Sequence, residues 1–293
     1  VRSAIENIGT AIQDTKLIGS LQRNTRIQPR EEDSFDIDIL VVLGSFTGWL
    51  PAGHPNGINS SQALDYVLSS VHESDRYSTK NPEKDAPTIT LEFVDGVKVE
   101  LVPAYVDNIG QAPDGSMTPP QGRGYWIPRA GGGWTHADYD FDADFVSRMN
   151  TVNGKRLVPA IKMLKAVKRL HFPALRSFAL EVIASQAIPL ILRHIEEQGQ
   201  RGISDAQLLK LFFVVGKDML SMPMSIPGSN SPAIVLDTVM AGTVAATFDA
   251  IVKHIDATES LTTEGAKVEA WRILFGEVFP TRVQKTYERT LSQ

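Results

Sequence analysis

The stretch from Ile18 to Leu43 constrains the fold most, because it places two carboxylates on a strand that is otherwise apolar. Residues 35–43, FDIDILVVL, alternate in character, and a strand sends successive side chains to opposite faces. One face carries only apolar side chains: Phe35, Ile37, Ile39, Val41 and Leu43. The other face carries the remaining members: Asp36, Asp38, Leu40 and Val42. The pattern predicts a strand covered on both sides, with two acids near its beginning.

These two acids need an explanation. A buried carboxylate without a partner is costly enough that it takes up a proton instead, and two adjacent carboxylates repel each other. A divalent cation relieves both effects, and carboxylate oxygens suit Mg²⁺ or Mn²⁺. The alternative is that Asp36 and Asp38 lie at a frayed strand start and face water. An Asp-x-Asp pair alone favours neither interpretation.

A third acid follows on a predicted hairpin. The alternating runs TITLEFV, residues 88–94, and VKVELVPAYV, residues 97–106, are joined by Asp95-Gly96, which is typical of a two-residue turn. Such a turn pairs Leu91 with Glu100 and predicts that Glu100 lies on an apolar face, where an acid needs a cation.

Two alternatives to this role for Glu100 stay open. An ordinary ion pair between Lys98 and Glu100 would explain the acid without a metal. Glu92 competes as the third ligand, although the expected register puts it on the opposite face.

Gly19-Ser20 precedes the acids by a short loop. A glycine lets the backbone approach a ligand closely, and Ser20 offers a hydroxyl and an N–H to phosphate oxygens. Gly-Ser is also a common turn, and only its spacing ahead of Asp36 singles it out. Arg23 and Arg26 follow, and a solvated loop explains them equally well.

Together, Gly19-Ser20, Asp36-x-Asp38 and Glu100 resemble the nucleotidyltransferase superfamily of the DNA polymerase β type. Within it, the segments GSLQRNTRIQP, FDIDILVVL and VELVPA are most similar to the bacterial cyclic-oligonucleotide synthases, the cGAS/DncV-like nucleotidyltransferases. The family usually has Asp where Glu100 stands, so the metal spacing could differ. The resemblance implies that Asp36, Asp38 and Glu100 hold two Mg²⁺ or Mn²⁺ ions, that Gly19 and Ser20 bind phosphates, and that Thr25 helps fix the loop.

Two further segments carry the resemblance into the second half. Residues 160–170, AIKMLKAVKRL, are similar to the family helix whose lysine contacts the triphosphate, which implies this role for Lys165. Residues 177–181, SFALE, imply that Ser177 contacts a phosphate and that the Phe178 ring lies under a base. A cluster of cationic side chains such as the one around Lys165 is usually a solvated helix face, and a ring such as Phe178 is more often core.

The amino-acid composition narrows the classes of protein to which the chain could belong. The 293 residues are 42% apolar and 22% charged, as in a globular protein of one large or two modest domains. The net charge of −5 argues against tight nucleic-acid binding and favours a small phosphorylated substrate. The absence of cysteine excludes disulfides, thiolate metal sites and Cys nucleophiles. No apolar run reaches the roughly 18 residues of a membrane span, so we expect no membrane contact. The resemblance implies a cytoplasmic bacterial protein.

The predicted fold class is α/β (α+β), with a polymerase β-like nucleotidyltransferase core on a mixed sheet, packed against a C-terminal helical domain. The core would span 1–150, including an N-terminal helix, and the helical domain 151–293. The spacing of apolar residues predicts helices over 2–13, 60–73, 142–150, 154–170, 173–198, 204–222, 233–257 and 260–275. Residues 107–134 read as a long loop, and 222–232 as a polar interruption at the rim of the site.

The resemblance implies a function. The chain would join nucleoside triphosphates without a template into a cyclic di- or trinucleotide, releasing pyrophosphate, and the product would activate a separate effector protein in antiphage defence. The alternatives are a nucleotidyltransferase acting on RNA, a protein or a small molecule, a catalytically silent nucleotide sensor, and a metal-dependent phosphohydrolase. The last would need clustered histidines, and the six in this chain are scattered.

Overall fold

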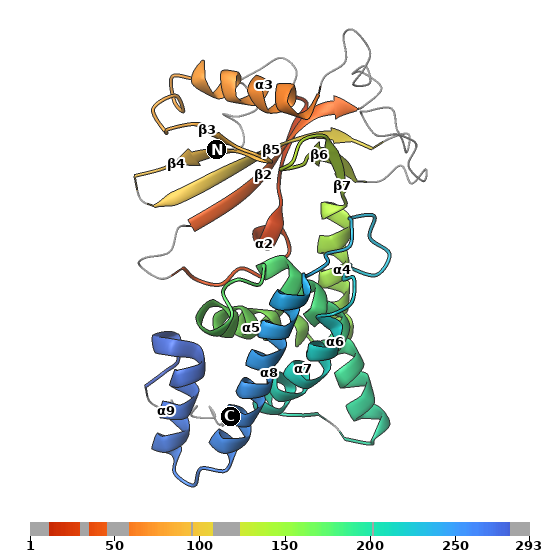
Figure 1. Ribbon diagram of the computed structural model, residues 1–293, viewed down its shortest axis with the longest axis vertical. Helices are drawn as coiled ribbons and strands as arrows, with labels where there is room; N and C mark the ends of the chain where they lie inside the picture. The colour runs from red at the N-terminus through yellow and green to blue at the C-terminus, as the bar shows by residue number, and fades with distance from the viewer. Residues whose placement is uncertain are drawn as a thin grey trace, which may run out of the picture. The chain divides into compact units, whose positions relative to one another are not determined.

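The computed structural model describes residues 12–29, 35–45, 59–94, 96–107, 124–200 and 202–281. The chain divides into two compact units. Figure 1 labels their helices and strands. The first unit comprises residues 1–149 and 225–233, and the second comprises 150–224 and 234–293. The expected division after residue 150 did not foresee that 225–233 groups with the first unit. Nearly all of the helix expected over 2–13 lies outside the described residues.

The described part of the first unit is built on a seven-stranded mixed sheet. Its main path has the order β1-β2-β5-β4-β3, and β6 pairs with β5 and β7. Strands β2 and β5 are parallel, whereas the other pairs are antiparallel. The strands are β1 (Asp14–Leu17), β2 (Phe35–Ser45), β3 (Glu83–Asp85), β4 (Thr88–Glu92), β5 (Val97–Val106), β6 (Tyr125–Pro128) and β7 (Trp134–Ala137).

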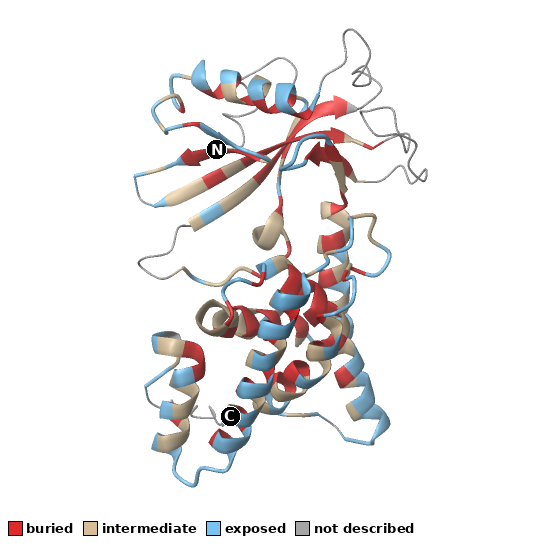
Figure 2. Cartoon of the chain, in the orientation of Figure 1, coloured by how far each residue is buried: buried red, intermediate tan, exposed pale blue. Residues whose placement is uncertain are grey.

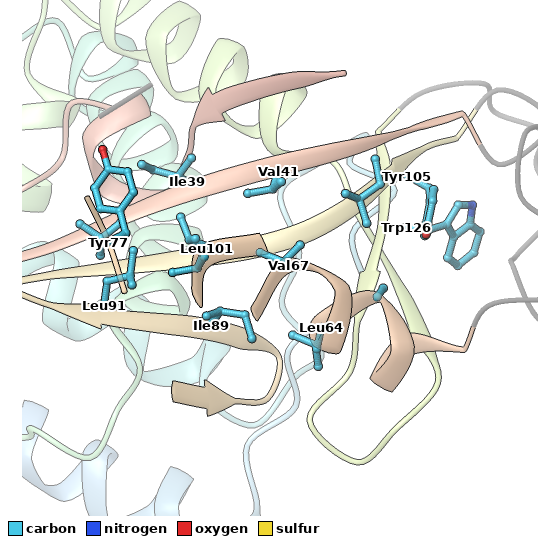
Figure 3. Close-up of a cluster of buried hydrophobic side chains, with 14 of the residues drawn as sticks. Ile39, Val41, Leu64, Val67, Tyr77, Ile89, Leu91, Leu101, Tyr105 and Trp126 are labelled. Carbon is cyan, nitrogen blue, oxygen red and sulfur yellow. The ribbon is translucent and has the colours of Figure 1, made fainter. Parts of the chain in front are cut away.

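Both faces of β2 are covered, as its alternation predicts. On one face, Ile39 and Val41 pack in a buried cluster with Leu64 and Val67 of helix α3 (Ser60–His72), as Figure 3 shows. On the other face, Leu40 and Val42 belong to a separate cluster that includes Ile18, Val102 and Tyr125. Residues 39–43 of β2 are therefore buried on both faces, and the two acids precede them near the beginning of the strand.

The hairpin of β4 and β5 differs from the expected register by one residue. Phe93 N donates to Val97 O at 2.8 Å and Gly96 N donates to Phe93 O at 3.0 Å, so the turn is one residue longer than expected. Glu100 therefore pairs with Thr90, and the predicted pairing with Leu91 was wrong. Because side chains alternate along a strand, this shift moves Glu100 to the opposite face from the one predicted.

The segment expected as a long loop over 107–134 contains strand β6 and the beginning of β7, so that expectation was wrong in part. These strands are short, and four residues give little periodicity to detect. The glycine-rich RAGGG stretch is their hairpin turn, in which Gly132 N donates to Arg129 O at 2.8 Å and Arg129 N to Gly133 O at 3.0 Å. Residues 108–123 lie outside the described ranges.

The second unit is helical, as expected. Helix α4 (Tyr139–Val152) begins in the first unit, and each later predicted helix has a counterpart. Polar capping residues determine where two of the helices begin. Ser204 and Gln207 form a capping box at the start of α7, and the Asp237 side chain accepts a hydrogen bond from Met240 N at the start of α8. The helices are α5 (Leu157–His171), α6 (Ser177–Glu197), α7 (Asp205–Met219), α8 (Thr238–Glu259), α9 (Glu264–Phe275) and the short η2 (Gly276–Val278).

Four phenylalanines form the centre of the helical core. Their rings lie 4.9 to 6.4 Å apart between centroids, mostly edge to face, in the contacts of Phe172, Phe212, Phe213 and Phe248. Helix α6 lies largely buried in this unit (Figure 2). Among the described helices it alone is long and apolar enough to cross a membrane, a property that buried core helices share.

Candidate active site

The two acids of β2 and the predicted third acid lie on one face of the sheet. The parallel register places Asp38 beside Glu100 and Asp36 beside Lys98. Neighbouring strands lie about 4.8 Å apart, and directly paired residues point to the same side. The structure therefore brings together the three acids that the sequence singled out, although it reaches this arrangement through a different hairpin register.

The crowding of these acids is visible in the electrostatics of Asp38. Burial, followed by the negative charges of Glu100 and Asp36, raises the pKa of Asp38 to about 6. Arg23 and Arg26 act in the opposite direction and reduce the shift. A bound cation would stabilise the ionised form of Asp38, which burial and the two neighbouring carboxylates disfavour.

Lys98 forms the ion pair that the sequence left open as an alternative. Its Nζ lies 3.2 Å from Glu100 Oε1, and both side chains are 28% exposed. The hydrogen bond to Glu100 raises the pKa of Lys98. Glu92 lies opposite Lys98 in the register and is exposed, so it shares the face of Glu100, and its predicted place on the opposite face was wrong.

Gly19 lies directly against Asp38. It begins the single helical turn α2 (Gly19–Gln22), and its φ of +70° is a conformation that side chains rarely adopt. A Cβ at this position would lie 2.1 Å from Asp38 Oδ2. Ile18 N donates to Asp38 O at 3.0 Å, which fixes the turn to the strand beside it.

The loop after α2 closes back on Ser20. Thr25 is buried, and its N–H donates to Ser20 O at 2.9 Å, with its hydroxyl 3.5 Å from the same oxygen. This geometry agrees with the loop-fixing role that the resemblance implies for Thr25.

Of the two arginines of this loop, one is buried and the other is partly exposed. Arg23 is only 8% exposed. Arg26 lies over the ring of Phe35, 3.1 Å from its centroid, and its Nη1 donates to Asp36 O at 2.9 Å. Sequence alone could not choose between a loop role and a site role for them, and the structure places both near the acids.

The fit of these residues to a divalent cation follows from their chemistry. Asp36, Asp38 and Glu100 offer hard oxygen donors on one face, and burial together with the negative charges of Glu100 and Asp36 raises the pKa of Asp38. Within the described ranges, no three His, Asp or Glu side chains already converge as a ligand set. The chemistry of these oxygen donors suits Mg²⁺ or Mn²⁺. To bind such an ion, Glu100 would have to leave Lys98 and turn toward the aspartates.

The predicted phosphate contacts of the second half lie in the helical unit. Lys165 Nζ is 2.6 Å from Glu181 Oε1, and the two side chains are 6% and 1% exposed, so the solvated-face interpretation of Lys165 was wrong. Ser177 begins α6 and is exposed, whereas Phe178 is half-buried. The roles of Lys165, Ser177 and Phe178 stay predictions.

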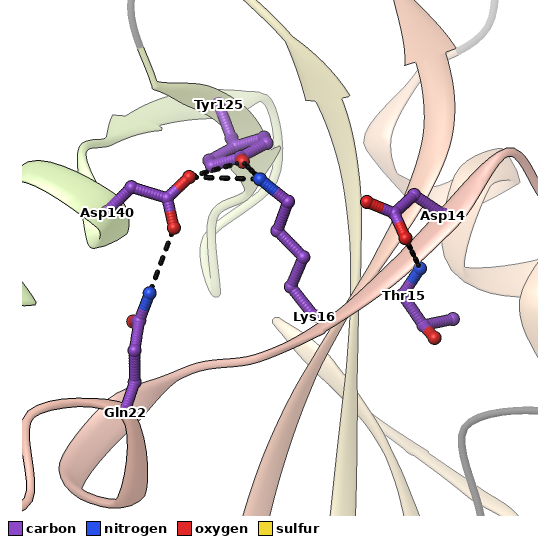
Figure 4. A network of polar contacts seen from close by, with 6 residues as sticks. All are labelled: Asp14, Thr15, Lys16, Gln22, Tyr125 and Asp140. Atoms are coloured by element: carbon purple, nitrogen blue, oxygen red, sulfur yellow. Dashed lines mark hydrogen bonds and ion pairs between the residues drawn. The ribbon is translucent and has the colours of Figure 1, made fainter.

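Sequence reasoning missed a polar network beside α2, shown in Figure 4. Lys16 on β1, Gln22 on α2, Tyr125 on β6 and Asp140 on α4 are joined by side-chain hydrogen bonds. Gln22 and Asp140 are separated by 118 positions, so no local pattern could reveal their contact.

It also missed how residues 225–233 attach to the first unit. Ser231 Oγ donates to Asp142 Oδ2 at 3.3 Å and accepts from Asp138 N at 2.9 Å. These bonds hold the segment to the beginning of α4. They explain why it groups with the first unit, and its expected place at the rim of the site stays a prediction.

Comparison with known proteins adds a family match. Residues 2–118 match the Second Messenger Oligonucleotide or Dinucleotide Synthetase domain. No curated protein matches the chain.

Solved structures with the same fold cover most of the chain. CdnC of Escherichia coli MS115-1 with ATP has a TM-score of 0.66 and 15% identity, covering 95% of this chain and 89% of its own. Vibrio cholerae DncV cyclic AMP-GMP synthase, with the linear intermediate pppA(3′,5′)pG, has a TM-score of 0.65 and 13% identity, covering 91% and 70%. Bradyrhizobium diazoefficiens CdnG with GTP has a TM-score of 0.65 and 12% identity, covering 94% and 87%. The predicted fold class is confirmed.

Proposed function

We propose that the chain, whose residues 2–118 match a second-messenger synthetase domain, is a nucleotidyltransferase of the cGAS/DncV type that makes a cyclic di- or trinucleotide from nucleoside triphosphates without a template. The observation that supports this most is the contact of Gly19 with Asp38, with Glu100 alongside on the next strand. It combines a place where a phosphate can approach backbone N–H groups with three adjacent carboxylates.

The nucleotide would bind with its phosphates at the Gly19-Ser20 turn. The glycine lets phosphate oxygens approach the backbone, and Ser20 donates from its N–H and hydroxyl. Asp36, Asp38 and Glu100 would hold two Mg²⁺ or Mn²⁺ ions. When bound, these ions supply the positive charge that stabilises the attacking and leaving oxygens of an in-line displacement.

The reaction itself is a transfer at the α-phosphorus. A nucleotide hydroxyl oxygen bonds to the α-phosphorus, the bond to the bridging oxygen of the triphosphate breaks, and pyrophosphate leaves. The hydroxyl proton passes to an adjacent carboxylate. A second or third transfer of the same kind closes the ring, so one site serves every step.

The resemblance also implies nucleotide contacts for three residues of the helical unit, which we include in the proposal. Ser177 is exposed at the first turn of α6, and the beginning of a helix favours a phosphate. Phe178 would lie under a base, and Lys165 would contact the triphosphate while held by Glu181.

The wider context of the activity follows from the same resemblance. Among the similar proteins, CdnC was solved with ATP and CdnG with GTP, and we propose nucleoside triphosphates as substrates here too. The cyclic product would leave and activate an effector protein in antiphage defence in the bacterial cytoplasm. Transfer to RNA, a protein or a small molecule, and binding without turnover, are the competing functions.

Product analysis tests this proposal. The purified protein is incubated with the four labelled nucleoside triphosphates and Mg²⁺ or Mn²⁺, treated with phosphatase and separated by chromatography. We expect a phosphatase-resistant product that disappears in an Asp36→Ala, Asp38→Ala variant, and omission of single nucleotides identifies the bases. A wild-type protein that neither binds nucleotide nor forms this product with either metal would rule the proposed site out.

A further inference from the structure

The helical turn α2, which carries Gly19 and Ser20, is too small to hold its own position. It comprises four residues, none of them buried, and no side chain caps its beginning. Isolated helical segments of this length are unstable, so their geometry is set by what they contact. The backbone bond from Ile18 N to Asp38 O fixes the entrance of the turn. At its far end, Thr25 N closes the following loop onto Ser20 O, but this bond ties the turn only to its own loop, so an anchor on another element is still needed.

Asp140 supplies that anchor. Gln22, the last residue of α2, donates from Nε2 to Asp140 Oδ1 at 2.9 Å. The second carboxylate oxygen, Oδ2, accepts from Lys16 Nζ at 3.0 Å and from the Tyr125 hydroxyl at 2.7 Å (Figure 4). Lys16 Nζ also donates to the Tyr125 hydroxyl at 2.6 Å, so three groups fix the orientation of the carboxylate.

The position of the Gln22 side chain depends on its hydrogen bond to Asp140. Its Oε1 atom is buried and accepts no hydrogen bond from the described residues. A buried acceptor without a partner is unfavourable, so the amide stays in place only if its other contact is strong. A hydrogen bond to an ionised carboxylate is of the stronger kind.

We propose that Asp140, acting through Gln22, is a positioning residue that holds the Gly19-Ser20 turn in the geometry that binds the nucleotide triphosphate. The inference rests on the proposed function of that turn. Asp140 itself would not touch the reacting atoms. Its loss would let the far end of α2 move, so the phosphates would bind more weakly while the acids of β2 and β5 stay in place.

If Asp140 had a purely structural role, its loss would change folding stability more than nucleotide affinity. Lys16 and Asp140 have side chains that are 37% and 48% exposed, and ion pairs that are this accessible contribute little to stability. The proposal therefore predicts a large effect on nucleotide affinity together with a small effect on folding.

The test compares Gln22→Ala, Asp140→Ala and the double variant with wild type. Asp249→Asn is the matched control, because Lys217 and Asp249 form a similar pair at 2.8 Å with side chains 38% and 54% exposed. KM and kcat of product formation, the dissociation constant of ATP and the urea midpoint are measured for each variant. Asp140→Asn adds a conservative variant that keeps an oxygen acceptor for Gln22.

We expect each single variant to raise KM and the dissociation constant about tenfold, with kcat within about threefold of wild type. The double variant should be no worse than either single variant, because both remove the same bond. Asp140→Asn should recover part of the affinity, and Asp249→Asn should match wild type. If wild type forms product and Gln22→Ala and Asp140→Ala bind ATP as tightly as Asp249→Asn, the positioning role is wrong. A wild type without binding or product would instead contradict the proposed function.

Discussion

Gly19 leaves no room for a side chain beside Asp38, because a Cβ at this position would lie 2.1 Å from Asp38 Oδ2. The contact links the turn proposed to bind phosphates with a carboxylate proposed to hold metal. A displacement of the Gly19 turn therefore also displaces the Asp38 carboxylate. The geometry of the site depends on having a glycine at position 19.

Gly19→Ala should abolish most of the activity. The added Cβ would push against the Asp38 carboxylate, and a φ of +70° also strains any side chain. We expect product formation to fall at least about 100-fold, equivalent to about 2.7 kcal/mol of transition-state stabilisation. Steady-state kinetics measures the loss.

Gly96→Ala is the matched control for this substitution. Gly96 has a similar φ of +77°, but nothing lies within 4 Å of the position a Cβ would take. It should cost about 1 kcal/mol of stability, as the strain alone requires, and leave activity nearly unchanged. Equal losses of activity in both variants would mean that strain, and not the contact with Asp38, limits Gly19.

Glu100→Gln should separate a metal ligand from a partner of Lys98. An amide oxygen binds Mg²⁺ more weakly than a carboxylate, so we expect activity to fall about 100-fold and the Mg²⁺ concentration for half-maximal activity to rise. Glu92→Gln is the control, since Glu92 shares this face and is exposed. If both variants keep wild-type activity, Glu100 serves only the ion pair with Lys98.

Sequence predicted the centre of the sheet well, since the alternation of Ile39 and Leu40 determines which face each covers. It also predicted helix starts where a local pair such as Ser204 and Gln207 forms the cap. The predicted register of the β4–β5 hairpin was wrong, because Asp95-Gly96 indicates a turn without fixing its length. One extra residue in the turn moves each side chain of β5 to the opposite face relative to β4.

Long-range polar contacts were beyond sequence reasoning for a different reason. Lys165 lies among other cations on its helix, and only the packing of α5 on α6 shows that its partner is Glu181. The contact of Gln22 with Asp140 likewise depends on strands and helices far apart in the chain. Such pairs are products of the assembled fold and leave no periodic pattern.

Asp38→Asn should stabilise the metal-free protein at neutral pH. The native pKa of Asp38 is raised from 3.8 to about 6, so its ionised form opposes folding above pH 6. Between pH 6 and 4 the native state binds a proton that the unfolded state does not, so stability rises as pH falls through this range. The variant should gain about 1–3 kcal/mol at pH 8, and the gain should disappear near pH 4.

Urea unfolding in EDTA at several pH values measures this effect. Added Mg²⁺ should stabilise wild type more than Asp38→Asn, because the variant lacks one carboxylate donor. A variant that is no more stable than wild type at pH 8 in EDTA would show that burial and the neighbouring acids do not disfavour the ionised Asp38 as its position indicates.

Lys165→Met tests the buried pair of the helical unit. It leaves the Glu181 carboxylate, which is 1% exposed, without the ammonium 2.6 Å away. Removing one partner of a buried ion pair typically costs about 3–5 kcal/mol, and we expect a loss of this size in urea unfolding. Lys217→Met, at the exposed pair with Asp249, should leave the urea midpoint nearly unchanged, because water already solvates both charges.

The double variant Lys165→Met, Glu181→Leu distinguishes the structural role of Lys165 from its predicted phosphate contact. Replacing both charges with apolar groups should recover most of the lost stability, because no buried charge is left without compensation. If Lys165 also contacts the triphosphate, this stable variant should still bind ATP at least about tenfold more weakly than wild type, since a charge-assisted contact to phosphate would be missing. Wild-type affinity in a folded double variant would show that Lys165 stabilises the helical core and does not contact the triphosphate.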